Sequence, residues 1–452
     1  MPKKKTALTI EERLQQALVP AEEQPYELPE NWVWTYGKFM FKPMETNKPQ
    51  GDFFYYIDID AIDNKRQAVT EAKKIKSKNA PSRASRKLHK GDTIFSLVRP
   101  YLRNIAYIDV SLAECIASTG FYVCTPVAVL QSKFLYRLMT SSYVVDGLNK
   151  HMKGDNSPSI RKDDIENYPI PLPPLAEQQR IVDRIEELFT KLDEAKEKLQ
   201  EVVDSFAVRK AAILHKAFTG ELTQKWRKEN GVELSSWEDS CFGDFTVSQY
   251  GYTEKAHWEK VGPKFLRITD IQNNHVDWNQ VPWCPIDEAG FKQYSVDIGD
   301  IMIARTGATT GKSYLITDKV DAVFASFLIR LKVIDKKLDY NYLYRYMQSE
   351  AYWQQITDFS SGIAQPGVNA NKLKKIKFLC PSLSEQHEIV RLIDSLLARE
   401  RKAQEAAEQA LTSIELMKKA ILEKAFRGEL GTNKASEASA MELLKQVLEQ
   451  EK

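Results

Sequence analysis

Several segments of the chain recur 208 residues further along the sequence, a spacing that we call the repeat offset. The segment PPLAEQQRIV at 173–182 returns as PSLSEQHEIV at 381–390, with six identities in ten. The segment AILHKAFTGEL at 212–222 returns as AILEKAFRGEL at 420–430, with nine identities in eleven. The same offset superposes Gly91-Asp92 on Gly299-Asp300, whereas the residues between the matched points differ almost completely. The sequence therefore predicts a duplicated unit of about half the chain, in which a shared frame holds dissimilar contents.

The shared segments have the pattern of long helices. Apolar residues alternate at spacings of four and three, which is the heptad pattern of a coiled coil. Each helix is expected to run for about 44 residues, or roughly 65 Å, and to end at Gly220 or Gly428. Ser382 and Glu385 have the spacing of a capping box at the start of the second helix. The two predicted seams are Ile181, Ile185, Leu188, Leu192, Leu199 and Phe206, and then Ile389, Ile393, Leu396, Ala403, Ala407, Ala410 and Ile414, with Glu400 as a polar interruption.

Large residues in the first seam and alanines in the second favour two helices that interdigitate. We therefore expect an intramolecular, antiparallel coiled coil, with the two inserts at its opposite ends. Two separate surface helices, each packed on its own globular half, are the alternative, but a strict heptad stripe is narrower than a surface helix usually needs.

The two inserts are similar in texture. Both contain short β-branched and aromatic runs, such as FFYYIDI at 53–59 and DIMIA at 300–304, followed by a helical stretch at 132–150 or 340–356. The expected fold class is α+β, with two repeated α+β domains separated by the two long helices. The expected boundaries are an amphipathic segment at 1–27, a first domain at 28–172, a central helix region at 173–228, a second domain at 229–380, a distal helix region at 381–430 and an amphipathic tail at 431–452.

Catalytic and metal motifs fail on their spacing. TGATTGKS at 306–313 has three residues between its glycines where a phosphate-binding loop needs four, so a turn between two strands is the better interpretation. His387-Glu388 lacks a second histidine at 391, and no glycine-rich dinucleotide motif is present. The sequence predicts no catalytic residue, no cofactor and no metal site. Scattered cysteines without CxxC spacing, and no apolar run of about 18 residues, predict a cytoplasmic protein outside the membrane.

Nucleic-acid signals are stronger. Residues 65–90 hold ten Lys or Arg and one acid, Glu71, among small polar residues that suit phosphate oxygens. A solvated loop is the alternative. Further candidates lie in strand-like runs and turns, where arginine can read guanine and threonine can contact other base edges. The predicted DNA-binding residues are Lys73, Lys74, Lys76, Lys78, Arg83, Arg86, Lys87, Arg99, Tyr101 and Arg103 in the first insert, and Arg267, Arg305, Thr306 and Lys312 in the second.

Several strings together closely resemble one family, the specificity subunit of type I restriction–modification systems. They are LPENW (28–32), RPYLRN (99–104), PLPPLAEQQRIVDRIEELF (171–189), LTQKWRKEN (222–230) and AILEKAFRGEL (420–430). The resemblance covers nearly the whole chain. It implies two target recognition domains that each read one half of a bipartite, asymmetric site in double-stranded DNA, with the helices as the spacer between them.

The resemblance also implies partners. Two methylation subunits would dock on the chain, bring S-adenosylmethionine and methylate an adenine at N6. Restriction subunits, with ATP and Mg, would join through that methylation core. The specificity chain itself would be non-catalytic and carry no cofactor, in agreement with the failed motif search.

Two questions stay open at the level of sequence. A non-catalytic coiled-coil scaffold with protein-binding inserts is the alternative function, whereas an enzyme with its own methyl-transfer site is disfavoured by the missing adenosyl-binding motif. The terminal segments at 9–19 and 439–450 are amphipathic. They either close a circular pseudo-symmetry of the chain or dock partners.

Overall fold

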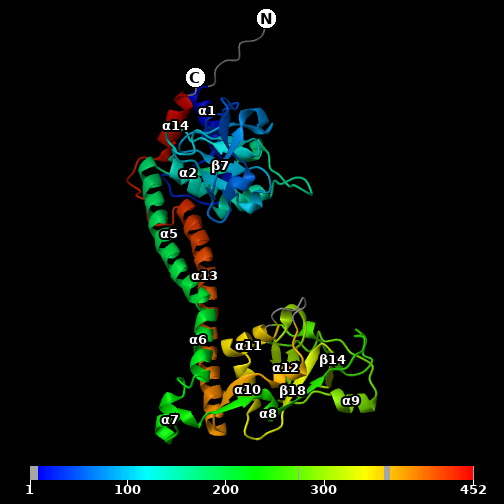
Figure 1. Ribbon diagram of the computed structural model, residues 1–452. Helices are drawn as coiled ribbons and strands as arrows, with labels where there is room; N and C mark the ends of the chain where they lie inside the picture. The colour runs from blue at the N-terminus through cyan, green and yellow to red at the C-terminus, as the bar shows by residue number, and fades with distance from the viewer. Residues whose placement is uncertain (1–8, 273, 361–366, 451–452) are drawn as a thin grey trace. The chain divides into compact units, whose positions relative to one another are not determined.

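The computed structural model describes residues 9–272, 274–360 and 367–450, which form two compact units (Figure 1). Unit 1 comprises Met1–Leu199 and Gln409–Lys452, and unit 2 comprises Gln200–Glu408. The segments that the two halves of the sequence share fold into three helices: α5 (Leu175–Asp204), α6 (Phe206–Phe218) and α13 (Leu383–Phe426). Each unit therefore holds one insert and a stretch of paired helices.

The insert of unit 1 is built from small sheets. A three-stranded antiparallel sheet has the order β10-β7-β8, and a four-stranded sheet has the order β5-β2-β9-β6 with β2 and β9 parallel. A ladder of β1 with β11 joins the start of the insert to its end. The strands are β1 (Val33–Tyr36), β2 (Phe53–Ile57), β3 (Ile62–Asp63), β4 (Ala68–Val69), β5 (Lys73–Lys76), β6 (Ala84–Lys87), β7 (Thr93–Ser96), β8 (Ile105–Tyr107), β9 (Ile116–Ser118), β10 (Phe121–Cys124) and β11 (Pro169–Leu172).

Short helices pack against these sheets and the long helices. They are α1 (Ile10–Ala17), α2 (Ser132–Met139), α3 (Ser142–Asn149), α4 (Lys162–Glu166) and α14 (Ala440–Gln450). In the core of unit 1, Phe134 of α2 meets Phe426 of α13 with ring centroids 5.4 Å apart. The terminal helices α1 and α14 pack on each other, and Arg13 donates to the carbonyl of Leu448 at 2.9 Å. The two amphipathic ends thus complete one core.

Unit 2 has the same plan with fewer strands. Its four-stranded antiparallel sheet has the order β13-β18-β15-β16, β14 pairs with β17 in parallel, and β12 pairs with β19. The strands are β12 (Glu238–Cys241), β13 (Thr246–Tyr250), β14 (Lys264–Leu266), β15 (Ile301–Ala304), β16 (Ser313–Leu315), β17 (Ala322–Phe324), β18 (Leu328–Val333) and β19 (Lys377–Cys380). The remaining helices are α7 (Gln224–Asn230), α8 (Phe242–Phe245), α9 (Glu288–Tyr294), α10 (Tyr340–Tyr346), α11 (Glu350–Ser360) and α12 (Ala370–Lys374).

The repeat offset relates the two units element by element. Helices α2, α3 and α4 begin one repeat offset before α10, α11 and α12, and β11 begins one repeat offset before β19. The predicted α+β class with repeated domains and long helices is confirmed. In the described part of the chain, no helix is long and apolar enough to cross a bilayer.

The long helices run antiparallel within each unit. In unit 1, Lys196 of α5 pairs with Glu415 of α13 at 2.6 Å, and Asp193 pairs with Lys418 at 2.5 Å. In unit 2, Arg209 of α6 pairs with Glu400 of α13 at 2.5 Å. As residue numbers fall along one helix, they rise along the other.

The predicted seam is buried unevenly. Ile181, Ile185, Ile389, Ile393, Ala407 and Ile414 are buried, while Leu188, Leu192, Leu199, Phe206, Leu396 and Ala410 are half-buried. Ala403 is exposed, so the described contacts do not place it in a buried seam. The first long helix also differs from the continuous helix that we expected, because it is interrupted at Ser205 between α5 and α6.

Candidate nucleic-acid interface

A buried carboxylate fastens the start of α5 in unit 1. Glu177 accepts from the indole of Trp32 at 2.7 Å, from Asn433 at 2.8 Å and from the hydroxyl of Thr432 at 3.3 Å. Trp32 directly precedes β1, while Thr432 and Asn433 follow α13. A buried charge requires such partners because an unpaired one is costly. The carboxylate therefore joins both terminal segments to the helix that leaves the insert.

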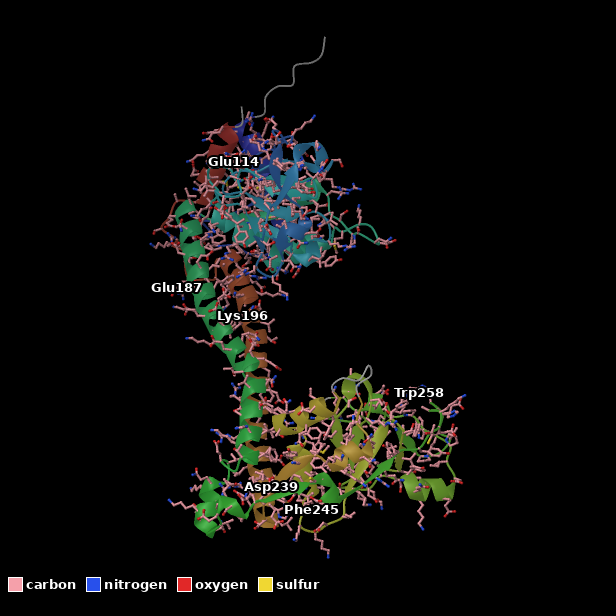
Figure 2. The ribbon with its side chains drawn as sticks, in the orientation of Figure 1. Glu114, Glu187, Lys196, Asp239, Phe245 and Trp258 are labelled. Atoms are coloured by element: carbon pink, nitrogen blue, oxygen red, sulfur yellow. The ribbon has the colours of Figure 1, made fainter. Side chains whose placement is uncertain are left out.

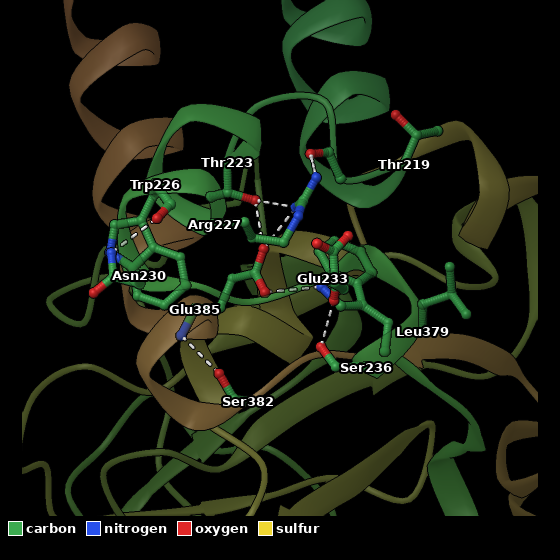
Figure 3. Close-up of polar contacts among 12 residues, drawn as sticks. Thr219, Thr223, Trp226, Arg227, Asn230, Glu233, Ser236, Leu379, Ser382 and Glu385 are labelled. Carbon is green, nitrogen blue, oxygen red and sulfur yellow. Dashed lines mark hydrogen bonds and ion pairs between the residues drawn. The ribbon is translucent and has the colours of Figure 1, made fainter.

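The equivalent carboxylate in unit 2 is Glu385 at the start of α13 (Figure 3). It accepts from the indole of Trp237 at 2.9 Å, from Thr223 at 2.7 Å and from the guanidinium of Arg227 at 2.7 Å. All of these partners are buried. They come from the segment between α6 and β12, so this segment does in unit 2 what the two terminal segments do in unit 1.

A glutamine beside each carboxylate holds the helical layer of the insert. Gln178 accepts from the backbone N–H of Gln131 at 2.7 Å and donates to the carbonyl of Val129 at 3.0 Å. Gln386 accepts from the N–H of Asp339 and donates to the carbonyl of Lys337, both at 2.8 Å. Each partner in unit 2 lies one repeat offset after its counterpart in unit 1. The inserts are thus attached to the long helices by the same bonds.

The turn after the central strand of each insert has an unusual backbone. Arg99 and Arg103, which flank the turn between β7 and β8, have φ values of 49° and 57°. Their equivalents in unit 2, Gly307 and Gly311, have φ values of 74° and 87°. Glycine adopts this left-handed region freely, whereas a side chain there costs roughly 1 kcal/mol or more. Unit 1 therefore carries strain at two arginines, a feature that clusters at functional sites.

The side chains of this turn differ in freedom. Arg99 is exposed and donates to the carbonyl of Asn156 at 2.9 Å. Tyr101, between the arginines, is 46% exposed. Arg103 is held by the carbonyl of Thr140 at 3.0 Å and by Asp146 at 3.3 Å. Arg99 and Tyr101 are thus the polar side chains of this turn that reach solvent, next to the exposed Leu102.

A second exposed patch of unit 1 lies on β2 and β5. Strand register places Tyr55 opposite Lys74 and Phe53 opposite Lys76. Both aromatic rings are about half exposed, and the Lys74 ammonium lies 5.1 Å from the Phe53 ring centroid. Cations interleaved with exposed rings suit a phosphate backbone and bases. The basic cluster was found from sequence, but its aromatic half was not, although alternate residues of FFYY on a half-buried strand must face outward.

The remaining basic candidates of unit 1 fall into two groups. Lys73 pairs with Asp58 and Lys87 pairs with Glu45, each at 2.6 Å. The hydrogen bond to Asp58 raises the pKa of Lys73. Lys78 and Arg83 are exposed and have no ion pair among the described residues, while Arg86 is half-buried in β6. Lys73 and Lys87 are therefore already neutralised by carboxylates of the chain. Lys78, Arg83 and Arg86 remain available to an outside anion.

In unit 2 the predicted residues lie around the equivalent turn and directly after β14. Arg305 stacks over the Tyr250 ring at 4.9 Å, Thr306 is half-buried, and Lys312 is exposed. Arg267 binds Asp270 through two bonds of 2.7 and 3.1 Å. Trp258, which is 67% exposed, lies 5.5 Å from that guanidinium and was missed because a lone tryptophan in a loop carries no pattern (Figure 2).

Comparison with known proteins identifies this frame. The model of the type I restriction modification DNA specificity domain matches residues 37–204 and again 235–410. The first match covers most of the first insert and all of α5, and the second covers most of the second insert and the first part of α13. The chain belongs to this family.

Individual relatives agree. The chain is 24% identical over 322 residues to the type I restriction enzyme EcoKI specificity subunit of Escherichia coli (strain K12), covering 70% of this chain and 69% of that one. It is 27% identical over 276 residues to the EcoBI specificity subunit of Escherichia coli, covering 58% of each. The HsdS subunit of Thermoanaerobacter tengcongensis superposes with a TM-score of 0.67 at 27% identity, covering 90% and 99%. A chain from a structure of type I system assembly and conformational transition gives 0.74 at 26%, covering 90% and 100%.

As a type I specificity subunit, the chain is a DNA-recognition component and not a catalytic one. Its two specificity domains are residues 37–204 and 235–410. The resemblance that the sequence motifs indicated is confirmed. Among the residues that the structure describes, no three His, Cys, Asp or Glu side chains gather as metal ligands would.

Proposed function

We propose that the two inserts are target recognition domains and that each reads one half of a bipartite, asymmetric site in double-stranded DNA. One observation carries this proposal: both units present the same left-handed turn on the same frame, but with different side chains. A fixed frame with variable tips is what two readers of different half-sites require. Arg99 and Tyr101 are the candidate readers of unit 1, and Arg305, Thr306 and Lys312 are those of unit 2.

Phosphate contacts come from a wider set of residues. We assign them to the exposed cations of β5 and the following loop, Lys74, Lys76, Lys78 and Arg83. Lys73, Lys87 and Arg267 would first exchange their carboxylate partners for phosphates. A steep fall of DNA affinity between low and moderate salt would support this assignment. Binding that does not depend on salt would favour the alternative function, a scaffold whose inserts bind proteins.

The paired helices would set the distance between the half-sites. Half-sites on one face of a duplex lie about 34–36 Å apart per helical turn, and a 44-residue helix is long enough to span that distance. Inserting four residues near residue 200 should lengthen the spacer of the DNA site and leave both half-sites unchanged. An unchanged spacer would argue against the helices as a ruler.

The catalytic steps belong to partners in this proposal. Two methylation subunits dock on the chain and methylate adenine N6 with S-adenosylmethionine, and restriction subunits that use ATP and Mg join through them. We assign no cofactor to the specificity chain, and we place the complex in the cytoplasm. The chain then contributes only the choice of DNA sequence.

The decisive experiment is a methylation map of cellular DNA. The chain is co-expressed with its methylation subunit, either intact, with Arg99→Gly and Tyr101→Ala, or with Arg305→Ala and Lys312→Ala. The intact chain should give a bipartite adenine motif, and each double variant should relax one half of it. Loss of the same half in both variants, or no motif despite a stable complex, would overturn the proposal.

A further inference from the structure

Unit 2 has an apolar cavity that the sequence did not predict. It has a volume of about 320 Å³ and lies between α6, the start of α11 and the β12–β19 ladder. Leu214, Phe218, Tyr346 and Phe378 supply its apolar wall. The charged side chains of Asp239, Glu350 and Lys377 also line it, together with His215.

The equivalent place in unit 1 is filled by three aromatic rings. The ring of Tyr26 lies 4.9 Å from that of Trp34 and 5.5 Å from that of Tyr143, centroid to centroid. Trp34 lies on β1 and Tyr143 on α3. Tyr26 comes from the segment that precedes β1 and packs against both other rings, which also touch each other at 5.8 Å, centroid to centroid.

The repeat shows why unit 2 is hollow. Trp34 pairs with Pro171 in the β1–β11 ladder, and the matching ladder pairs Asp239 with Leu379, so Asp239 replaces the tryptophan. Tyr143 and Ala351 are separated by the repeat offset and hold the same position, the second, of α3 and α11. Two of the three rings are therefore absent from unit 2.

The place of the third ring follows from two glycines. A Cβ at Gly428 would meet Pro29 at 2.4 Å, and a Cβ at Gly220 would meet Leu234 at 2.5 Å. Pro29 and Leu234 are thus equivalent, and Tyr26, three residues before Pro29, corresponds to Gly231. Gly231 has a φ of 65°, and a Cβ added there would meet no atom within 4 Å. Unit 2 supplies no ring from this segment either.

The contacts of Tyr26 define what the cavity of unit 2 can bind. Its hydroxyl donates to the carbonyl of Phe426 at 3.1 Å, and Arg427 lies 4.6 Å from its ring centroid. The equivalents of these two residues, Phe218 and Thr219, both line the cavity. The cavity thus has an apolar wall for a ring and, by analogy with unit 1, a helix-terminal carbonyl for a phenolic hydroxyl.

We propose that this cavity binds a tyrosine side chain presented by another polypeptide. The residues of this chain outside the described ranges (1–8, 273, 361–366 and 451–452) include no aromatic residue, so none of them can supply a ring to it. Unit 1 shows that the fold accepts a tyrosine from a segment in this position. The inference does not depend on the proposed DNA-reading function, because it rests on the comparison of the two units alone.

The test uses a peptide with the sequence of the segment that fills unit 1. The acetylated and amidated peptide AEEQPYEL (residues 21–28) is titrated into the full chain, and saturation-transfer NMR follows its ring protons. We expect saturable binding with a Kd of about 1 mM or tighter. A peptide with Tyr26→Ala should not bind, and one with Tyr26→Phe should bind about two- to tenfold more weakly because it lacks the hydroxyl donor.

Variants of the chain locate the binding. Ala351→Tyr and Asp239→Trp each restore a ring that packs on Tyr26 in unit 1 and should each strengthen binding about two- to tenfold. Ala351→Ser should not change it. Thermal unfolding checks that each variant folds, and the exposed position of Asp239 carries the test if Ala351→Tyr does not fold. Absence of binding to the intact chain, equal binding of the Tyr26→Ala peptide, or unchanged binding to Asp239→Trp would overturn the proposal.

Discussion

The Nε atom of Arg209 lies 2.5 Å from Oε2 of Glu400, and this ion pair joins α6 to α13 within unit 2. The same guanidinium donates to the carbonyl of Val202 at 3.2 Å and to the hydroxyl of Ser205. Glu400 interrupts the heptad pattern of α13, and Arg209 reaches back to the break between α5 and α6 at Ser205. The ion pair therefore links the interruption in one helix to the break in the other. The two irregularities are one feature.

This pairing predicts a measurable coupling between Arg209 and Glu400. In a double-mutant cycle with Arg209→Ala and Glu400→Ala, the coupling free energy should be about 1 kcal/mol, because both side chains are partly withdrawn from water. Urea unfolding of the four chains measures it. The pair Glu388–Arg391, which lies within one helix and whose arginine is more exposed than Arg209, is the control and should couple by about 0.3 kcal/mol. Equal coupling in the two pairs would contradict the special role of Arg209.

The two helix-start carboxylates should respond differently to loss of charge. Glu385→Gln leaves the buried guanidinium of Arg227 without its counter-ion and should lower the free energy of unfolding by about 3–5 kcal/mol. Glu177→Gln should cost only about 1 kcal/mol, since its partners Trp32, Thr432 and Asn433 are neutral and an amide still accepts from them. Denaturant unfolding of both variants measures the two losses of stability. A cost at 177 as large as at 385 would show that Arg227 is not the cause.

The strained turn of unit 1 predicts a trade between stability and DNA binding. Arg99→Gly should keep or raise the free energy of unfolding, by up to about 1 kcal/mol, because glycine relieves the left-handed backbone. The same variant should bind DNA more weakly and lower the salt dependence of binding by about one phosphate contact.

The matched change in unit 2 should lower the free energy of unfolding instead of raising it. A Cβ at Gly307 would meet no atom within 4 Å, so Gly307→Ala should cost about 1 kcal/mol through its backbone alone. Unfolding and salt-dependent DNA titrations test both variants. A destabilised Arg99→Gly chain with unchanged DNA affinity would mean that Arg99 is only structural.

Acidification should release the C-terminal segment of unit 1. Arg180 binds Glu437 through bonds of 2.8 and 2.7 Å, and this hydrogen bonding lowers the pKa of Glu437. A lowered folded pKa means that the contribution to stability is present above the ordinary pKa of glutamate and is lost as the pH falls through the folded value. The hydrogen-exchange protection of residues 431–450, taken relative to the intrinsic exchange rate at each pH, should therefore fall below about pH 4.

Glu437→Gln provides the control for that experiment. Its segment should exchange faster at neutral pH, because the charged partner of Arg180 is gone, and should lose the acid-induced step that depends on Glu437. An identical acid response in both chains would assign the titration to another group.

Sequence predicted the frame because its signals are local. The heptad spacing, the glycines that end the helices and the repeat offset can all be read along the chain. The break at Ser205 was not predictable, since it depends on Arg209 meeting Glu400 across the helix pair. The sequence predicts that the Glu385 side chain caps its own helix. In the structure its carboxylate instead accepts from Arg227, Thr223 and Trp237, which the tertiary structure brings to it.

The candidate interface was less predictable than the frame. A cluster of cations is visible in sequence, but the pairing of Lys73 with Asp58 and of Lys87 with Glu45 depends on which segments the fold brings together. The left-handed conformation of Arg99 was hidden because arginine gives no sign of it. Gly307, at the same position of the repeat, was the signal that could have revealed it.

The equivalence of Glu177 and Glu385 has a consequence for the covalent chain itself. One carboxylate is held by a continuous connection, and the other by two segments that approach from opposite ends of the polypeptide. The fold therefore tolerates a gap in the backbone at this place in one unit, and the same gap should be tolerated in the other. A chain cut beside Gly231 should reassemble from its two fragments, and joining the original ends would give a permuted protein with the same set of contacts.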